Sequence, residues 1–255
     1  MQDLKLSLIQ SVTHWHDIQA NLDMFEAKIS GLPDTTDVIV LPEMFSTGFT
    51  MDTNLAEEMD GPSVSWMQRM ASQTNTAVTG SIIASENGSV FNRMIWATPD
   101  GEINTYDKRH LFRMADEHNY FDFGTERTIV QWKGWNILLQ VCYDLRFPVW
   151  SRNRNMEYDA LIYVANWPAV RVSAWDALLK ARAIENLSYC VGLNRVGVDG
   201  KELKYNGHSG VYGPKGEILA FSDQEEVITV ILDGKELLRY REKFPAHLDA
   251  DDFKI

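Results

Sequence analysis

The sequence lacks the cysteine pairs and the His/Cys clusters from which disulfide frameworks and structural metal centres are built. It contains only two cysteines, Cys142 and Cys190, which lie in separate apolar runs without a CxxC pair. His14 and His16 in "THWHD" have no third candidate ligand near them, so loop histidines in contact with water are the simpler interpretation. We therefore expect neither a disulfide framework nor a bound metal.

Positive charge is also scarce. The chain carries 24 Lys and Arg against 36 Asp and Glu, which gives a formal net charge of -12. Such a charge repels phosphate backbones and anionic lipids, so we expect no nucleic-acid partner and no membrane partner. The N-terminal "MQDLKLSLIQ" lacks the features of a signal peptide, and no segment approaches the ~20 apolar residues of a membrane span. We expect a soluble cytoplasmic protein.

The sequence does contain enough apolar residues for one large core, since 45% of its residues are hydrophobic. "LKLSLIQ" and "DVIVLP" are typical of strands, and they flank a helix in which Ile18, Leu22, Phe25 and Ile29 fall on one face. This alternation predicts an α/β fold. We expect a single domain over residues 1–245, followed by an acidic tail at 246–255.

The second half of the chain repeats the βαβ order of the first. "WNILLQVCYD" and "YDALIYVA" predict two more strands, and "FPVWSRNRN" between them predicts the start of a helix. A longer helix follows, whose apolar face is made by Ala174, Ala177, Leu178, Ala181 and Ile184. The hairpins "IWATPDGEI" and "GVYGPKGEI" also resemble each other, which favours two related halves packed sheet against sheet.

Three polar residues stand at predicted strand ends, where α/β proteins place their chemistry. Glu43 follows "VIVLP", Lys108 lies in "NTYDKRHLF", and Cys142 ends "ILLQVC". A thiol there becomes a nucleophile if a base accepts its proton and a cation stabilises the charge that develops on the attacked group. Glutamate, lysine and cysteine would fill these three roles. Cys190 within "SYCVGL", by contrast, is typical of a small buried apolar residue.

In this order, "LPEMFSTGF", "YDKRHLF" and "VCYDLRFP" resemble the signature of the nitrilase (carbon–nitrogen hydrolase) superfamily, and within it the ω-amidase branch. The resemblance extends over nearly the whole chain. It implies a four-layer α-β-β-α sandwich of two mixed sheets packed face to face. It also implies Glu43 as general base, Lys108 as oxyanion stabiliser and Cys142 as nucleophile. "EHNYFDFG" matches a pattern of carbamoylase-type relatives, which implies Glu117 as a second active-site glutamate.

The resemblance implies an amidohydrolase that needs no cofactor. It would cleave the terminal amide of a small ω-amido keto-dicarboxylate, such as α-ketoglutaramate or α-ketosuccinamate, to the acid and ammonia through a cysteine thioester. Tyr143 and Asp144 stand where true nitrilases carry Trp-Glu, which favours an amide over a nitrile. A deaminated-glutathione amidase, an N-carbamoylase, a nitrilase and a catalytically silent binding module are the alternatives. The cysteine could rest as a thiol beside a carboxylate or as a thiolate beside an acid.

The carboxylate of such a substrate needs a local cation in a protein of this charge. Arg146 matches a substrate-binding position of relatives and Arg171 in "NWPAVR" is the second candidate, with Trp167 as a pocket wall. A structural ion pair between Arg146 and Asp144 or a neighbouring acid is an equally good interpretation. The backbone N–H of Tyr143 is expected to contact the oxyanion. The resemblance also implies a homodimer or larger homo-oligomer formed through helical faces.

Overall fold

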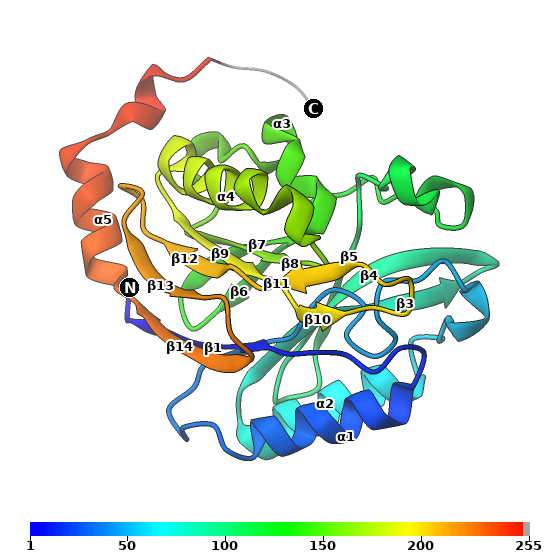
Figure 1. Ribbon diagram of the computed structural model, residues 1–255. Helices are drawn as coiled ribbons and strands as arrows, with labels where there is room; N and C mark the ends of the chain where they lie inside the picture. Colours follow the sequence, from blue (N-terminus) through cyan, green and yellow to red (C-terminus); the bar gives the residue numbers. More distant parts are fainter. Residues whose placement is uncertain (252–255) are drawn as a thin grey trace.

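A computed structural model describes residues 1–251 of the protein. It has four layers, in which two six-stranded mixed sheets pack face to face and helices cover their outer faces (Figure 1). The last residues of the expected acidic tail, 252–255, lie outside the described part of the chain. The layered architecture is the predicted α-β-β-α sandwich.

The first sheet has the strand order β14-β1-β2-β3-β4-β5. Strands β1, β2 and β3 are parallel, and β4 and β5 follow as antiparallel neighbours, so β5 runs in the same direction as β3. The strands are β1 (Leu4–Gln10), β2 (Val38–Val40), β3 (Ala77–Glu86), β4 (Ser89–Ala97), β5 (Ile103–Asp107) and β14 (Glu226–Leu232).

The second sheet repeats this plan with the order β13-β12-β9-β8-β7-β6. Its three central strands, β7, β8 and β9, are parallel. The strands are β6 (Ile129–Trp132), β7 (Trp135–Val141), β8 (Ala160–Val164), β9 (Tyr189–Leu193), β12 (Ser209–Tyr212) and β13 (Ile218–Ser222). A separate two-stranded hairpin, β10 (Val196–Val198) and β11 (Lys204–Asn206), was not foreseen from the sequence.

Alternation along the strands divides the apolar residues between two cores. In β1, Leu6 and Leu8 point into the core between the sheets, whereas Ile9 points into the core beneath helices α1 and α2. β2 divides in the same way, with Val38 and Val40 facing the other sheet. Because both faces are covered, the parallel strands of either sheet are almost completely buried, whereas the edge strands β6, β13 and β14 are partly exposed.

Helices α1 (Ile18–Ile29) and α2 (Pro62–Thr74) cover the first sheet, and α4 (Val172–Asn186) covers the second (Figure 1). The other α-helices are the four-residue α3 (Pro148–Ser151) and α5 (Gly234–Lys243). In α1 the predicted face holds, since Leu22, Phe25 and Ile29 are buried. No helix among residues 1–251 is long and apolar enough to cross a membrane.

Helix α4 exists where the sequence predicts it, but the face it buries is different. Trp175 and Leu179 pack onto the sheet, and a side chain at Gly192 would collide with both of them. The large side chains therefore decide which way the helix turns, because they bury more apolar area than alanines do. The expected apolar face, represented by Leu178 and Ile184, is left half-buried to exposed.

Candidate active site

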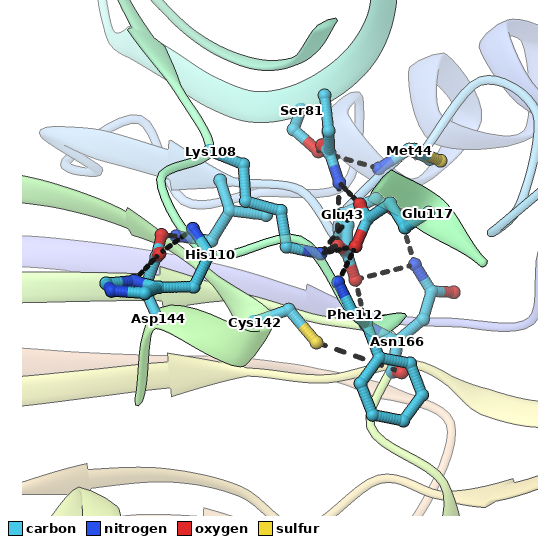
Figure 2. Close-up of polar contacts among 12 residues, drawn as sticks. Glu43, Met44, Ser81, Lys108, His110, Phe112, Glu117, Cys142, Asp144 and Asn166 are labelled. Carbon is cyan, nitrogen blue, oxygen red and sulfur yellow. Dashed lines mark hydrogen bonds and ion pairs between the residues drawn. The ribbon is translucent and has the colours of Figure 1, made fainter. Parts of the chain in front are cut away.

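Strand ends bring the predicted polar residues to one edge of the sandwich. Glu43 lies three residues beyond Val40, the last residue of β2, while Lys108 directly follows β5 and Cys142 directly follows β7. Since β2 and β5 run in the same direction, their carboxyl ends meet at the same edge. Figure 2 shows Glu43, Glu117, Lys108 and Cys142 gathered there.

Lys108 is the centre of a buried ionic network. Its Nζ donates hydrogen bonds to Glu43 Oε1 at 2.8 Å and to both carboxylate oxygens of Glu117 at 2.9 Å. The side chains of all three are fully buried. Burial alone would lower the pKa of Lys108, but the charges of Glu117 and Glu43 outweigh it and raise that pKa above its usual value. The amine is therefore a permanent cation.

Two asparagines fix the carboxylate of Glu43. Asn92 Nδ2 donates to Glu43 Oε1 at 2.8 Å, and the backbone N–H of Asn166 donates to Oε2 at 2.8 Å. Asn92 is held in turn by the hydroxyl of Ser81, which donates to its Oδ1 at 2.8 Å. Sequence reasoning assigned none of these three residues. Asn166 stands directly after the expected strand "YDALIYVA", so its position at a strand end was the signal to look for.

Glu117 enters the site from an irregular loop. It begins the short helix η3 (Glu117–Asn119) and is fully buried. Besides Lys108, the backbone N–H of Phe112 donates to its Oε2 at 2.6 Å and Asn92 Nδ2 to its Oε1 at 3.2 Å. Burial and the charge of Glu43 raise the pKa of Glu117, whereas Lys108 lowers it. The structure thus brings this glutamate to the place that its motif suggests.

Cys142 occupies a turn rather than the end of a strand. The strand expected over residues 135–144 stops at Val141, and Cys142 starts the short helix η4 (Cys142–Arg146) with a left-handed φ of 45°. Its Sγ lies 4.0 Å from the carbonyl oxygen of Asn166. Burial and the charge of Glu43 raise the pKa of the thiol, although Lys108 opposes them. These effects favour a thiol over a thiolate in the resting site.

A cavity of about 940 Å³ opens above Cys142. It lies at the upper end of the ~300–1,000 Å³ range in which proteins bind small molecules. The four residues expected to contact substrate all line it, namely Tyr143, Arg146, Trp167 and Arg171. Sequence reasoning missed several other lining residues because they belong to loops without a recognisable pattern, among them Arg113 and Met114 before η3 and Lys201, Leu203 and Tyr205 of the β10–β11 hairpin.

Arg146 has the surroundings of a binding residue. Its guanidinium lies 5.2 Å from the centre of the Trp167 ring, and within residues 1–251 it forms no ion pair with a carboxylate. Asp144, its suggested partner, instead accepts hydrogen bonds from His110 and Tyr106. The ion pair proposed as the structural alternative is therefore absent from the described part of the chain.

The site contains carboxylates, a lysine and a thiol, but not the geometry of a metal centre. Across the described residues, no group of three or more His, Cys, Asp and Glu side chains is placed to hold a metal ion. The arrangement instead offers a nucleophile, a proton acceptor beside it and a fixed cation. Such a set can carry out acyl transfer on a carbon–nitrogen bond.

Known proteins share both this sequence and this fold. Residues 5–242 match the family model described as carbon-nitrogen hydrolase. The chain is 50% identical to "Omega-amidase YafV" of Escherichia coli (strain K12) with 100% of both chains covered, and 34% identical to "2-oxoglutaramate amidase" of Bacillus subtilis (strain 168) with 84% of each covered. The structure of XC1258 from Xanthomonas campestris, a CN-hydrolase superfamily protein, superposes with a TM-score of 0.98 at 45% identity over 100% of both chains. The predicted sandwich is thereby confirmed, and the chain belongs to the carbon–nitrogen hydrolase family.

Proposed function

We propose that the protein is an ω-amidase that hydrolyses the terminal amide of a small ω-amido keto-dicarboxylate, such as α-ketoglutaramate or α-ketosuccinamate. The observation that carries the proposal is the buried Lys108 ammonium, which is held by two carboxylates beside a thiol at the floor of a cavity. A binding module would not need this costly arrangement of buried charges. The relatives named omega-amidase and 2-oxoglutaramate amidase support the same substrate class.

In the first half of the reaction Cys142 attacks the amide carbonyl. Glu43, whose charge acts on the thiol, accepts its proton as the C–S bond forms. The Lys108 ammonium and the backbone N–H of Tyr143 stabilise the oxyanion, because preformed donors act where charge develops. Glu43 then gives the proton to the leaving nitrogen, the C–N bond breaks, and ammonia departs from the thioester.

In the second half water replaces ammonia. Glu43 accepts a proton from the water as its oxygen attacks the thioester carbon, and Lys108 again stabilises the oxyanion. The C–S bond breaks, the proton returns to the sulfur, and the free acid leaves. Every proton in this cycle is carried by Glu43, so the reaction needs neither a metal nor an organic cofactor.

Glu117 supports the reaction through Lys108. With both of its oxygens 2.9 Å from the Lys108 Nζ, it fixes the ammonium and balances its charge after Glu43 takes up a proton. Without Glu117, the oxyanion would be the only counter-charge of the Lys108 ammonium once Glu43 is protonated, and no fixed carboxylate would hold the ammonium in place. We therefore assign Glu117 to the active site together with Glu43, Lys108 and Cys142.

Arg146 is the proposed anchor for the substrate carboxylate. A guanidinium can bind a carboxylate through two parallel hydrogen bonds, and that of Arg146 has no carboxylate partner among residues 1–251. Trp167 forms the wall against which it packs. Arg171 lines the same cavity, but its Nη2 lies 2.7 Å from the Met114 sulfur and its charge 5.4 Å from the Phe112 ring, which makes it the second choice.

We further infer a cytoplasmic homodimer built from one domain over residues 1–245. Apolar side chains that the sheet does not cover support pairing, since Ile184 of α4 is 44% exposed and Val149 of α3 is 54% exposed. Sedimentation of the pure protein at micromolar concentration tests this inference. A species of twice 29.1 kDa or more supports it, and a monomer contradicts it.

The proposed activity is tested by measuring ammonia released from a panel of ω-amides, a carbamoyl compound and nitriles. We expect the keto-acid amides to be the best substrates of the wild-type protein and to be inert with Cys142→Ala. A preference for the carbamoyl compound or the nitrile would contradict the proposed substrate class, but it would still agree with Cys142 as the nucleophile. A correctly folded protein that releases no ammonia from any compound would favour a binding module.

A further inference from the structure

Asp144 is a buried carboxylate that the proposed reaction does not use. It is fully buried in η4, two residues after Cys142, and does not line the cavity. Its Oδ1 accepts hydrogen bonds from the backbone N–H of His110 at 3.0 Å and pairs with His110 Nδ1 at 2.8 Å. Its Oδ2 accepts from the Tyr106 hydroxyl at 2.8 Å and from the Val141 N–H at 3.0 Å. Burying a carboxylate is costly, and these four contacts offset the cost.

The partners of Asp144 flank the two residues that carry the reaction. Tyr106 and His110 stand two positions before and two positions after Lys108, and Val141 immediately precedes Cys142. Lys108 follows a strand of the first sheet and Cys142 follows a strand of the second. The carboxylate of Asp144 thus connects the segment around Lys108 to Val141, which precedes Cys142. Figure 2 shows the contact between His110 and Asp144.

The turn at Cys142 needs such support. Its φ of 45° lies in the left-handed region, where a residue with a side chain costs of order 1–3 kcal/mol and stays only if its surroundings enforce it. The Val141 N–H bond to Asp144 closes this turn. Tyr106 is equally constrained, because its hydroxyl also accepts a hydrogen bond from Trp150 Nε1 at 2.9 Å.

We propose that Asp144 is a positioning residue that sets the distance and orientation between the Lys108 ammonium and the Cys142 thiol. Its effect on catalysis rests on the proposed function, whereas its effect on the thiol does not. The proposal predicts that loss of the carboxylate lowers kcat and leaves KM nearly unchanged, because Asp144 does not line the substrate cavity. A misplacement of about 1 Å can cost about 100-fold in rate, and this is the size of effect we expect.

Asp144→Asn is the test variant. The new amide NH₂ would face N–H donors of Val141 or His110, so the tie weakens while the volume of the side chain is kept. Asp159→Asn is the matched control. Asp159 is another buried carboxylate, which accepts from Arg241 Nη1 at 2.7 Å and from the Asn136 N–H at 3.0 Å. Both variants should lower Tm, but only Asp144→Asn should lower kcat per active site.

A second readout does not depend on amide hydrolysis. The rate at which iodoacetamide alkylates Cys142, measured by mass spectrometry of the peptide, should change in Asp144→Asn and not in Asp159→Asn. If no amide is hydrolysed by the wild type, the proposed function fails while this readout still decides the role of Asp144. Equal kcat and equal alkylation rates in Asp144→Asn and wild type would overturn the proposal.

Tyr106→Phe keeps the proposal testable if Asp144→Asn does not fold. It removes one of the four contacts and leaves the carboxylate in place. We expect a smaller loss of kcat with an unchanged KM, and a double variant whose loss is less than the product of the two single losses, because both act through one contact. An unchanged kcat in Tyr106→Phe, or fully independent effects in the double variant, would contradict the proposal.

Discussion

The two cysteines of this protein have the same chemistry but stand at different depths of the same sheet. Cys190 lies inside β9, opposite Leu161 within β8. Val141, the residue just before Cys142, lies opposite Val164 at the end of β8. Three residues of parallel strand separate these levels, which is about 10 Å. Cys190 is enclosed by the core, and Cys142 lies at the floor of the cavity.

Burial and acidity do not distinguish these two thiols. Burial raises the pKa of both Cys142 and Cys190 above the usual value. What differs is the set of groups within reach. Cys142 lies near Glu43, Lys108 and Glu117, whereas the charges that act on Cys190 are those of Arg182 and Glu185, which form an ion pair with each other on α4. The comparison teaches that reactivity here follows from position at a strand end and from the neighbours that meet there.

Replacing each cysteine by serine should give the largest difference between the two thiols. Cys142→Ser should lower ammonia release by at least about three orders of magnitude, since a hydroxyl beside the same base is a far poorer nucleophile than a thiol. Cys190→Ser changes a buried side chain of similar size in the core and should retain most of the activity. Steady-state assays of both variants, with Tm as a check on folding, measure the contrast. Loss of activity in the Cys190 variant alone would reverse the assignment.

Replacing Lys108 tests whether the cation beside Cys142 is needed for the reaction. Lys108→Met should lower kcat by about 10²–10³-fold, because one oxyanion donor is lost. It should also lower the free energy of unfolding by about 3–5 kcal/mol, since Glu43 and Glu117 are left buried without their counter-ion. Lys215→Met at a surface ion pair is the control, and it should leave kcat unchanged. Full activity in Lys108→Met would remove the cation from the mechanism.

The sequence predicted the chain positions of the reactive residues better than the surroundings that hold them. Glu43 and Cys142 could be found because an apolar run stops abruptly before or at each of them. Lys108 could be identified only from the three motifs together, because the charged cluster Asp107–His110 around it is typical of a solvated turn. Asn92 and Asp144 gave no such signal, because their roles depend on contacts with residues 25 to 49 positions away.

The fold shows the same division between local and distant effects. Strands and helices were predicted where one period dominates, as in β1 and α1. Helix α4 buried a different face because Gly192 in a neighbouring strand leaves room for Trp175 and Leu179. The strand expected through Asp144 ended at Val141 because the carboxylate turns back to the Val141 N–H. A propensity scale contains neither fact, since the first arises from a tertiary contact and the second from one specific hydrogen bond between a side chain and the backbone three residues before it.

The substrate anchor is a further feature that only the Cys142 side of the sheet offers. Arg146→Met should raise KM for a keto-acid amide by roughly 10- to 150-fold, which corresponds to the loss of about 1.5–3 kcal/mol from a charged hydrogen bond. A neutral amide of similar length should lose little. Arg171→Met is the matched variant and should have the smaller effect on KM. Equal losses on both amides would make Arg146 a structural residue.

The smallest change that we expect is a shift in the pKa of the Cys142 thiol when Glu43 is replaced. The negative charge of Glu43 helps to raise the thiol pKa, so Glu43→Gln removes a group that disfavours the thiolate, while the Lys108 cation that favours it stays. Thiolate absorbance in a Cys190→Ser background should therefore appear at lower pH in Glu43→Gln than in the parent, although hydrolysis is lost. An unchanged or higher titration midpoint would show that Glu43 does not act on this thiol.

The thioester itself is the most direct test of the account. Wild-type protein mixed with α-ketoglutaramate and quenched in acid should carry the acyl group on the peptide that contains Cys142, as seen by mass spectrometry. The peptide that contains Cys190 should be unmodified. Ammonia release without any acyl group on Cys142, or with the acyl group on Cys190, would contradict the assignment of Cys142 as the nucleophile.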